Sequence, residues 1–185
     1  RLVHALRTLP TPYVILDLGA GTSESTLDFF LAADQKIIAA VPEPTSIENC
    51  YRFVKSSFYR RMRMAEHELG LKEVIEGAMD SRNKYGIRSP ADLLRHVSTI
   101  DPAAGARLIN LISDFHLHLI LNQVRTRSDI ELGHAMKSVC HKYFGVDVSY
   151  LGYVDHDNAV WQALRQRRPM VTEHPYSSIV GQFLS

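Results

Sequence analysis

The sequence predicts an α/β fold in which a mostly parallel sheet is flanked by helices. Short apolar runs suited to strands alternate with longer stretches of helical periodicity. The runs are Tyr13–Leu16, Lys36–Val41, Leu117–Leu121 and Tyr150–Val154. They lack polar alternation, which is typical of strands covered on both faces of a parallel sheet. The rhythm of strand and helix indicates right-handed βαβ units.

Composition narrows the class of protein. The chain has 185 residues, 45% hydrophobic and 22% charged, so it can bury a sizeable core as a single domain over 1–185. A formal net charge of +1 argues against a nucleic-acid binder held by bulk charge. No transmembrane segment or signal peptide is evident, and Cys50 and Cys140 are isolated thiols, so we expect a cytoplasmic protein.

The stretch Tyr13–Glu24 (YVILDLGAGTSE) joins the first predicted strand to a glycine-rich turn. Asp17 follows the strand, and the glycines let the backbone turn sharply and approach a ligand. Thr22 or Ser23 can cap the amphipathic helix that comes next. Phosphates bind at such strand-loop-helix junctions, although many α/β proteins turn this way for packing alone.

Helical periodicity fills the remaining stretches. Predicted helices cover Arg1–Thr11, Ile47–Met62, Thr126–Phe144, Ala159–Arg168 and Ile179–Leu184. Residues from about 60 to 115 read as a helical insertion, with Asp101-Pro102 as a helix start, and they form a candidate partner-binding surface.

A basic face accompanies the apolar stripe of the helix over Ile47–Met62. It carries Arg52, Lys55, Arg60, Arg61 and Arg63. A solvated helix face is the simplest explanation, and a surface for a partner protein, DNA or acidic lipid is the sharper alternative.

The third predicted strand delivers Asn122 to its carboxyl end, with Arg125 just beyond. An amide presents a donor and an acceptor side by side, which matches the paired edge of a purine ring. Asn122 therefore suits base selection, and the simpler alternative is that it caps a turn before the next helix.

Four segments together resemble the MinD/ParA family of P-loop ATPases, and within it the MinD-like regulators of flagellar number and placement. They are DLGAG, TSESTLDFFLAADQKIIAAVPEPTSIENCYRFVK, LILNQVR and YLGYVDHDNAVWQALRQRRP. The resemblance implies a P-loop NTPase, Rossmann-like fold that binds ATP or ADP with Mg²⁺. It further implies a homodimer that closes on ATP and opens on hydrolysis, which switches contacts with a regulatory protein partner. A peripheral contact with DNA or with the inner face of the membrane is compatible with it.

The resemblance also assigns site residues. Asp17 would hold Mg²⁺ through water, and the amide of Gly21 would sense the γ-phosphate. Asn122 would read adenine, and the backbone from Val154 to His156 would flank the base. The residues so implied are Asp17 and Gly21 for catalysis, Asp17 for the metal, and Asn122, Arg125, Val154 and Asp155 for the cofactor.

No phosphate-binding loop of the form GxxxxGK[ST] or GKGGxGK occurs in the sequence. We expect the carboxyl-terminal part of a longer ATPase, able to hydrolyse ATP only with the upstream loop. The alternative is a non-catalytic protein- or DNA-interaction module that retains the fold. In the family, the strand before the missing loop lies between those ending at Asp17 and Pro42, so an open position in the sheet is expected.

Overall fold

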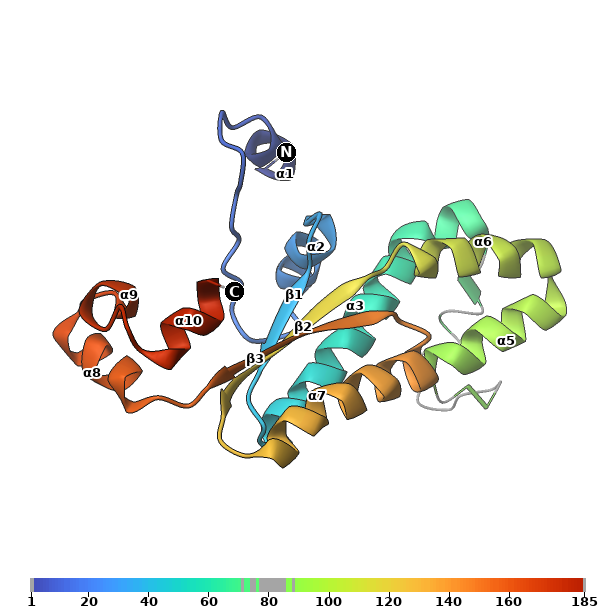
Figure 1. Ribbon diagram of the computed structural model, residues 1–185. Helices are drawn as coiled ribbons and strands as arrows, with labels where there is room; N and C mark the ends of the chain where they lie inside the picture. Colours follow the sequence, from blue (N-terminus) through green and yellow to red (C-terminus); the bar gives the residue numbers. More distant parts are fainter. Residues whose placement is uncertain (1, 71, 74–75, 77–85, 88, 185) are drawn as a thin grey trace.

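A three-stranded sheet forms the centre of the computed structural model, which describes residues 2–70, 72–73, 76, 86–87 and 89–184. The strands β1 (Ile37–Ala40), β2 (Leu117–Val124) and β3 (Val148–Asp155) lie in the order β1-β2-β3 (Figure 1). Both neighbouring pairs are parallel, and helices connect consecutive strands. The predicted α/β class with a parallel sheet is confirmed.

Helices make up most of the remaining described chain. They are α1 (Leu2–Arg7), α2 (Glu24–Ala32), α3 (Pro44–Leu69), α5 (Pro90–Ile100), α6 (Pro102–Ser113), α7 (Arg127–Val139), α8 (Asn158–Gln166), α9 (Met170–Glu173) and α10 (Ser178–Leu184). A π-helical turn, η1 (Cys140–Phe144), extends α7 to Gly145, which ends it at a φ of 65°. Within the described ranges, no helix is both long and apolar enough to cross a membrane.

Local capping signals set several helix starts. The Asp101 carboxylate accepts from the amides of Ala103 and Ala104 at 2.9 and 3.0 Å, which confirms the predicted start of α6. Thr126 caps α7 in a reciprocal pair with Asp129. These interactions span at most three residues, so the sequence alone could specify them.

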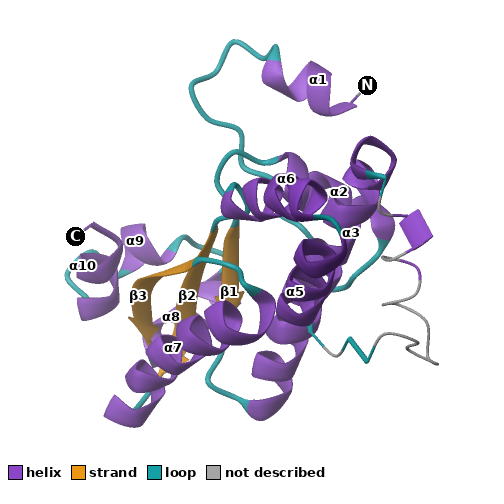
Figure 2. Ribbon diagram, turned by 90° about the vertical axis from the view of Figure 1, so that its right-hand side faces the viewer, coloured by secondary structure: helices purple, strands orange, loops and turns teal. Residues whose placement is uncertain are grey.

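One face of the sheet carries the core. α3 packs on β1 and α7 packs on β2 and β3, on the same side of the sheet (Figure 1). Leu117, Leu119 and Leu121 point to this side and are buried. Their cluster continues into α5 and α6 through Leu93 and Leu108, so the described part of the predicted insertion shares the same core. Figure 2 shows α3, α5 and α6 together on one side of the sheet.

The opposite face of the sheet is open, which corrects the expectation that the strands are covered on both faces. Ile37 is 55% exposed, and His118 and Ile120 beside it are half-buried. The strand order explains this difference. Right-handed crossovers that step in one direction, from β1 to β2 to β3, place both connecting helices on the same face.

The predicted strand over Tyr13–Leu16 is wrong. Residues 13–19 have no regular structure, and the side chains of Tyr13 and Ile15 are 84% and 91% exposed. A parallel strand needs a hydrogen-bonded neighbour, and within the described residues β1 pairs only with β2. The segment instead forms an extended arm that leads away from the sheet to α1 (Figure 1), and the other edge of β1 has no strand partner among the described residues.

Most of the described part of the predicted insertion is helical, while residues 86–87 and 89 are not. α3 continues to Leu69, and α5 and α6 span most of residues 90–113. The helical prediction for residues 71, 74–75, 77–85 and 88 lies outside the described residues.

His118 on the open face should make stability depend on pH. Its Nε2 lies 2.8 Å from Gln35 Oε1, while its buried Nδ1 has no hydrogen-bond partner. Burial, followed by the charges of His116 and Lys36, lowers the pKa of His118 below its ordinary value of 6.5. As pH falls, the unfolded chain therefore binds a proton at His118 before the folded chain does. We expect the free energy of unfolding to decrease as pH falls below 6.5 toward the folded pKa, and to be insensitive to this group above 6.5.

Urea denaturation at a series of pH values measures this dependence. His118→Gln should flatten the slope below pH 6.5, whereas His4→Gln, which changes an exposed histidine of α1, should leave the slope as it is in the parent. An unchanged slope in His118→Gln would show that the acid sensitivity arises elsewhere.

Candidate functional site

The carboxyl ends of β2 and β3 bring four of the predicted site residues to one edge of the sheet. Parallel strands end at the same edge, where α/β proteins commonly bind ligands. Val124 pairs with Asp155 across the two strands. The amide of His156 donates to the carbonyl of Val124 at 2.8 Å, which continues the contact beyond β3. Asn122, Arg125, Val154 and Asp155 all lie at this edge.

The backbone at the end of β2 is strained. Gln123 has a φ of 59°, a left-handed conformation that is uncommon for a residue other than glycine. The strand register shifts between Leu121 and Val124, so this residue sits in an irregular part of the ladder. Strained backbone of this kind persists only where the surrounding structure holds it in place, and it clusters at ligand sites. No pattern in the sequence singled out Gln123.

The side chain of Asn122 is held in place by this turn. Its Oδ1 accepts from the backbone amide of Gln123 at 2.9 Å, and the residue is exposed. This local bond is the turn-capping role that the sequence left open. An amide oxygen has two lone pairs, and the amide nitrogen has two donors, so Asn122 can still present a donor and an acceptor to a ligand.

Arg125 lies between the sheet edge and the start of α7. Its guanidinium Nη2 is 3.3 Å from Nε2 of His156. Its backbone amide donates to Oδ2 of Asp129 at 3.0 Å, and this bond is the main reason why the pKa of Asp129 is lowered. The Arg125 backbone is thereby fixed, and its positive charge stays at the edge beside β3.

Asp155 is hydrogen-bonded by a residue that no pattern in the sequence singled out. Its amide donates to Oε1 of Gln182 at 3.0 Å, and Nε2 of Gln182 donates to Oδ2 of Asp155 at 2.7 Å. This paired contact ties α10 to the end of β3. Oδ1 of Asp155 has no hydrogen-bond partner among the described residues, so it can accept a hydrogen bond from a ligand. A contact between residues 27 apart leaves no pattern in a single sequence.

Asp17 and Gly21 are not joined to this edge. Both are exposed, and no hydrogen bond or ion pair among the described residues links either of them to Asn122 or Asp155. Gly21 has a φ of 145° and open space around it. Within the described part of the chain, no group of three or more His, Cys, Asp or Glu side chains could hold a metal ion. Mg²⁺ often takes only one or two carboxylates together with phosphate oxygens and water, so Asp17 remains suited to that role.

The buried thiols do not contribute to this edge. Burial raises the pKa of Cys50 to about 11 and that of Cys140 to about 12. Both residues line a small apolar space between β2, α3 and α7, where they act as core side chains.

The fold and this edge define an α/β protein with a polar cluster at the carboxyl ends of its parallel strands. A scan of protein-family models and a search of curated proteins both found no match to this chain.

Proposed function

We propose that this chain is part of a MinD/ParA-type ATPase domain that binds adenine at the carboxyl edge of β2 and β3. The observation that carries the proposal is the convergence of Asn122, Arg125 and Asp155 at this edge, with open polar groups on Asn122 and Asp155. The strained residue Gln123 between them supports a ligand site.

The open polar groups fit a purine. An adenine presents a ring nitrogen acceptor beside an amino donor. The Asn122 amide can donate a hydrogen bond to the ring nitrogen and accept one from the amino group. Oδ1 of Asp155 can accept another hydrogen bond from the ligand. Arg125 adds a positive charge that suits an anionic nucleotide.

The phosphate side of the proposed site uses Asp17 and Gly21, together with a phosphate-binding loop that does not occur in this sequence. When bound, Mg²⁺ would neutralise charge on the phosphates. The open position beside β1 suits the strand that precedes such a loop. In this proposal the complete domain closes as a homodimer on ATP and regulates the placement of a cellular structure through a protein partner.

A non-catalytic interaction module is the second candidate. The C-terminal helices expose large apolar side chains, with Trp161 at 59%, Leu164 at 70% and Phe183 at 62% exposure. Arg165 stacks on Trp161 at 4.8 Å. Aromatic and arginine side chains together are enriched where proteins bind one another.

Calorimetric titration of ATP and GTP, each with Mg²⁺, distinguishes the two candidates when it is made on the full-length natural protein. We expect ATP to bind more tightly than GTP, and Asn122→Ala to reduce this preference by about tenfold or more, because it removes a paired hydrogen-bond contact. Asn110→Ala changes an exposed asparagine on α6 and is the matched control.

Asp17→Ala should weaken ATP binding in the presence of Mg²⁺ and leave binding in EDTA unchanged. Equal affinity for ATP and GTP, or no effect of Asn122→Ala on the preference, would overturn the adenine site. If the full-length protein bound neither nucleotide, the interaction module would be favoured.

A further inference from the structure

A groove of about 500 Å³ lies between the start of α2 and the middle of α3. Its wall on α3 is formed by Arg52, Lys55, Ser56, Tyr59 and Arg63. Their spacing of three or four residues places them along one stripe of the helix. Thr22, just before α2, lines the opposite side together with Glu24 and Leu27 of α2, and Arg60 lies between the two walls. The volume falls in the range of small-molecule sites and is far larger than a packing defect.

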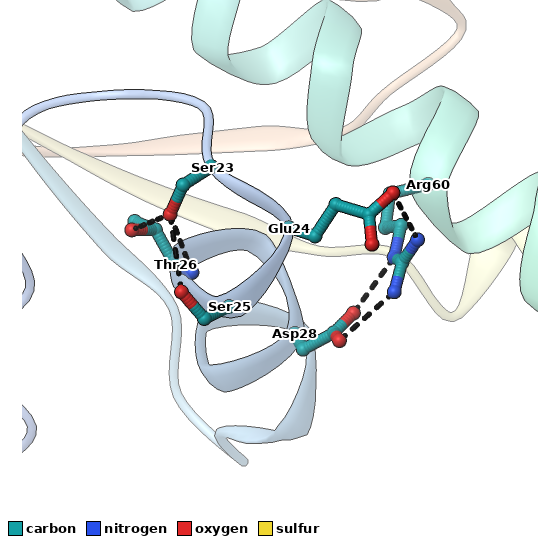
Figure 3. Close-up of polar contacts among 6 residues, drawn as sticks. All are labelled: Ser23, Glu24, Ser25, Thr26, Asp28 and Arg60. Carbon is teal, nitrogen blue, oxygen red and sulfur yellow. Dashed lines mark hydrogen bonds and ion pairs between the residues drawn. The ribbon is translucent and has the colours of Figure 1, made fainter.

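Arg60 holds the two walls of the groove together. Its Nε and Nη2 bind the two carboxylate oxygens of Asp28 at 2.8 and 2.9 Å, and its Nη1 lies 3.3 Å from Glu24 (Figure 3). The hydrogen bonds from Arg60 lower the pKa of Asp28. The side chain of Arg60 is only 23% exposed, so this two-pronged contact is a fixed link between α2 and α3.

The cations of the basic face that the sequence predicted on α3 therefore do not all have the same role. Arg60 is engaged with α2, and Arg61 donates to the carbonyl of Leu111 on α6 at 2.9 Å. Arg52 pairs with Glu48 at 2.7 Å. These contacts leave two cations on the groove side.

Lys55 and Arg63 have no ion-pair partner among the described residues. The ammonium of Lys55 lies 6.0 Å from the centre of the Tyr59 ring. The hydroxyl groups of Thr22 and Ser56 make no hydrogen bond to another described residue, so they are available to a ligand. Glu24 also lines the groove, and its carboxylate is paired with Arg60 at 3.3 Å. Two cations without an ion-pair partner among the described residues and the hydroxyl groups of Thr22 and Ser56 therefore face the same groove.

This set of groups matches an anion with more than one charged group. Lys55 and Arg63 are separated by about 12 Å along the helix axis, from a rise of about 1.5 Å per residue. Their long side chains can converge from both ends of the groove on a compact ligand. Phosphate oxygens accept well from lysine, arginine and hydroxyl donors, and Tyr59 offers an apolar wall.

We propose that this groove binds a phosphate-bearing small anion with at least two anionic groups, through Lys55, Arg63, Thr22 and Ser56. Thr22 directly follows Gly21, which the proposed ATPase site uses for phosphate, whereas Lys55, Ser56 and Arg63 on α3 have no part in that site. The groove proposal therefore does not depend on adenine binding. The anion can be a free diphosphate compound or the multiply phosphorylated headgroup of a lipid, because both present the same chemistry.

Calorimetric titration of the full chain with inorganic pyrophosphate tests the free form. Flotation with neutral vesicles that contain or lack a bisphosphorylated inositol lipid tests the membrane form. We expect saturable binding in at least one arm, and Lys55→Gln/Arg63→Gln should weaken it by about tenfold or more, since each change removes a charge-assisted hydrogen bond.

The double variant Arg107→Gln/Lys137→Gln is the matched control, because it removes the same charge from exposed positions on α6 and α7. It should leave binding unchanged, as should Asn122→Ala, which alters the proposed adenine site. Binding to pyrophosphate alone identifies a soluble ligand, and binding to vesicles alone identifies a lipid headgroup. Absence of binding in both arms, or equal weakening by the two double variants, would overturn the proposal.

Discussion

Phe58→Ala should lower the free energy of unfolding by about 3–5 kcal/mol, the usual cost of removing a buried aromatic ring. Phe58 lies in the middle of α3 and is 1% exposed. Its ring packs edge-on against Tyr59 with 5.5 Å between the centroids, and it belongs to the cluster that joins α3 to the sheet and to α5 and α6. Removing the ring leaves a cavity at the point where these elements meet.

Urea denaturation followed by circular dichroism measures the change. Met64→Ala is the control, since Met64 lies on the same helix but is 63% exposed, and its replacement should change stability by about 0.5 kcal/mol or less. Similar losses for Phe58→Ala and Met64→Ala would contradict the position of the core described here.

Gly133→Ala should destabilise the protein by about 1–3 kcal/mol or more, because a methyl group at this position overlaps the ring of Tyr150. Gly133 is buried on α7, and Tyr150 lies on β3 beneath it. The absence of a side chain lets the helix approach the strand closely. The overlapping atoms lie at the far end of the Tyr150 ring, so either the ring or the helix must shift to admit the methyl group.

A double-mutant cycle with Tyr150→Ala separates this clash from a general loss of packing. The methyl group should cost much less when the Tyr150 ring is absent, which gives a favourable coupling energy. Gly181→Ala on α10 is the matched control, because no atom lies within 4 Å of the added methyl group. It should stabilise the protein by about 0.5–1 kcal/mol through helix propensity. Destabilisation of the same size at both glycines would argue against the overlap.

The parts of the fold that the sequence predicted correctly depend on interactions between residues that are close together in the chain. The strand over Lys36–Val41 became β1, and the short run Tyr150–Val154 became the centre of β3. Thr126 and Asp101 start their helices through side chains that reach the next turn. Asn122 and Arg125 were recognised because they lie just beyond the predicted strand Leu117–Leu121, although β2 continues to Val124 and so includes Asn122.

The misprediction at Tyr13–Leu16 has a different origin. The run is apolar enough for a buried strand, yet a strand forms only when another strand offers it hydrogen bonds. The open face of the sheet was missed for a related reason, since burial depends on which side the connecting helices take.

The chain's sequence by itself determined the α/β class, most helix starts and the polar residues at the ends of β2 and β3, because periodicity and capping act over a few residues. Only the tertiary structure decided that Gln182 forms a hydrogen bond with Asp155 and that Arg60 joins the two walls of the groove through Asp28. It also decided that Tyr13–Leu16 stays outside the sheet. These contacts join residues far apart in the chain, and their free energy depends on packing that no local pattern records.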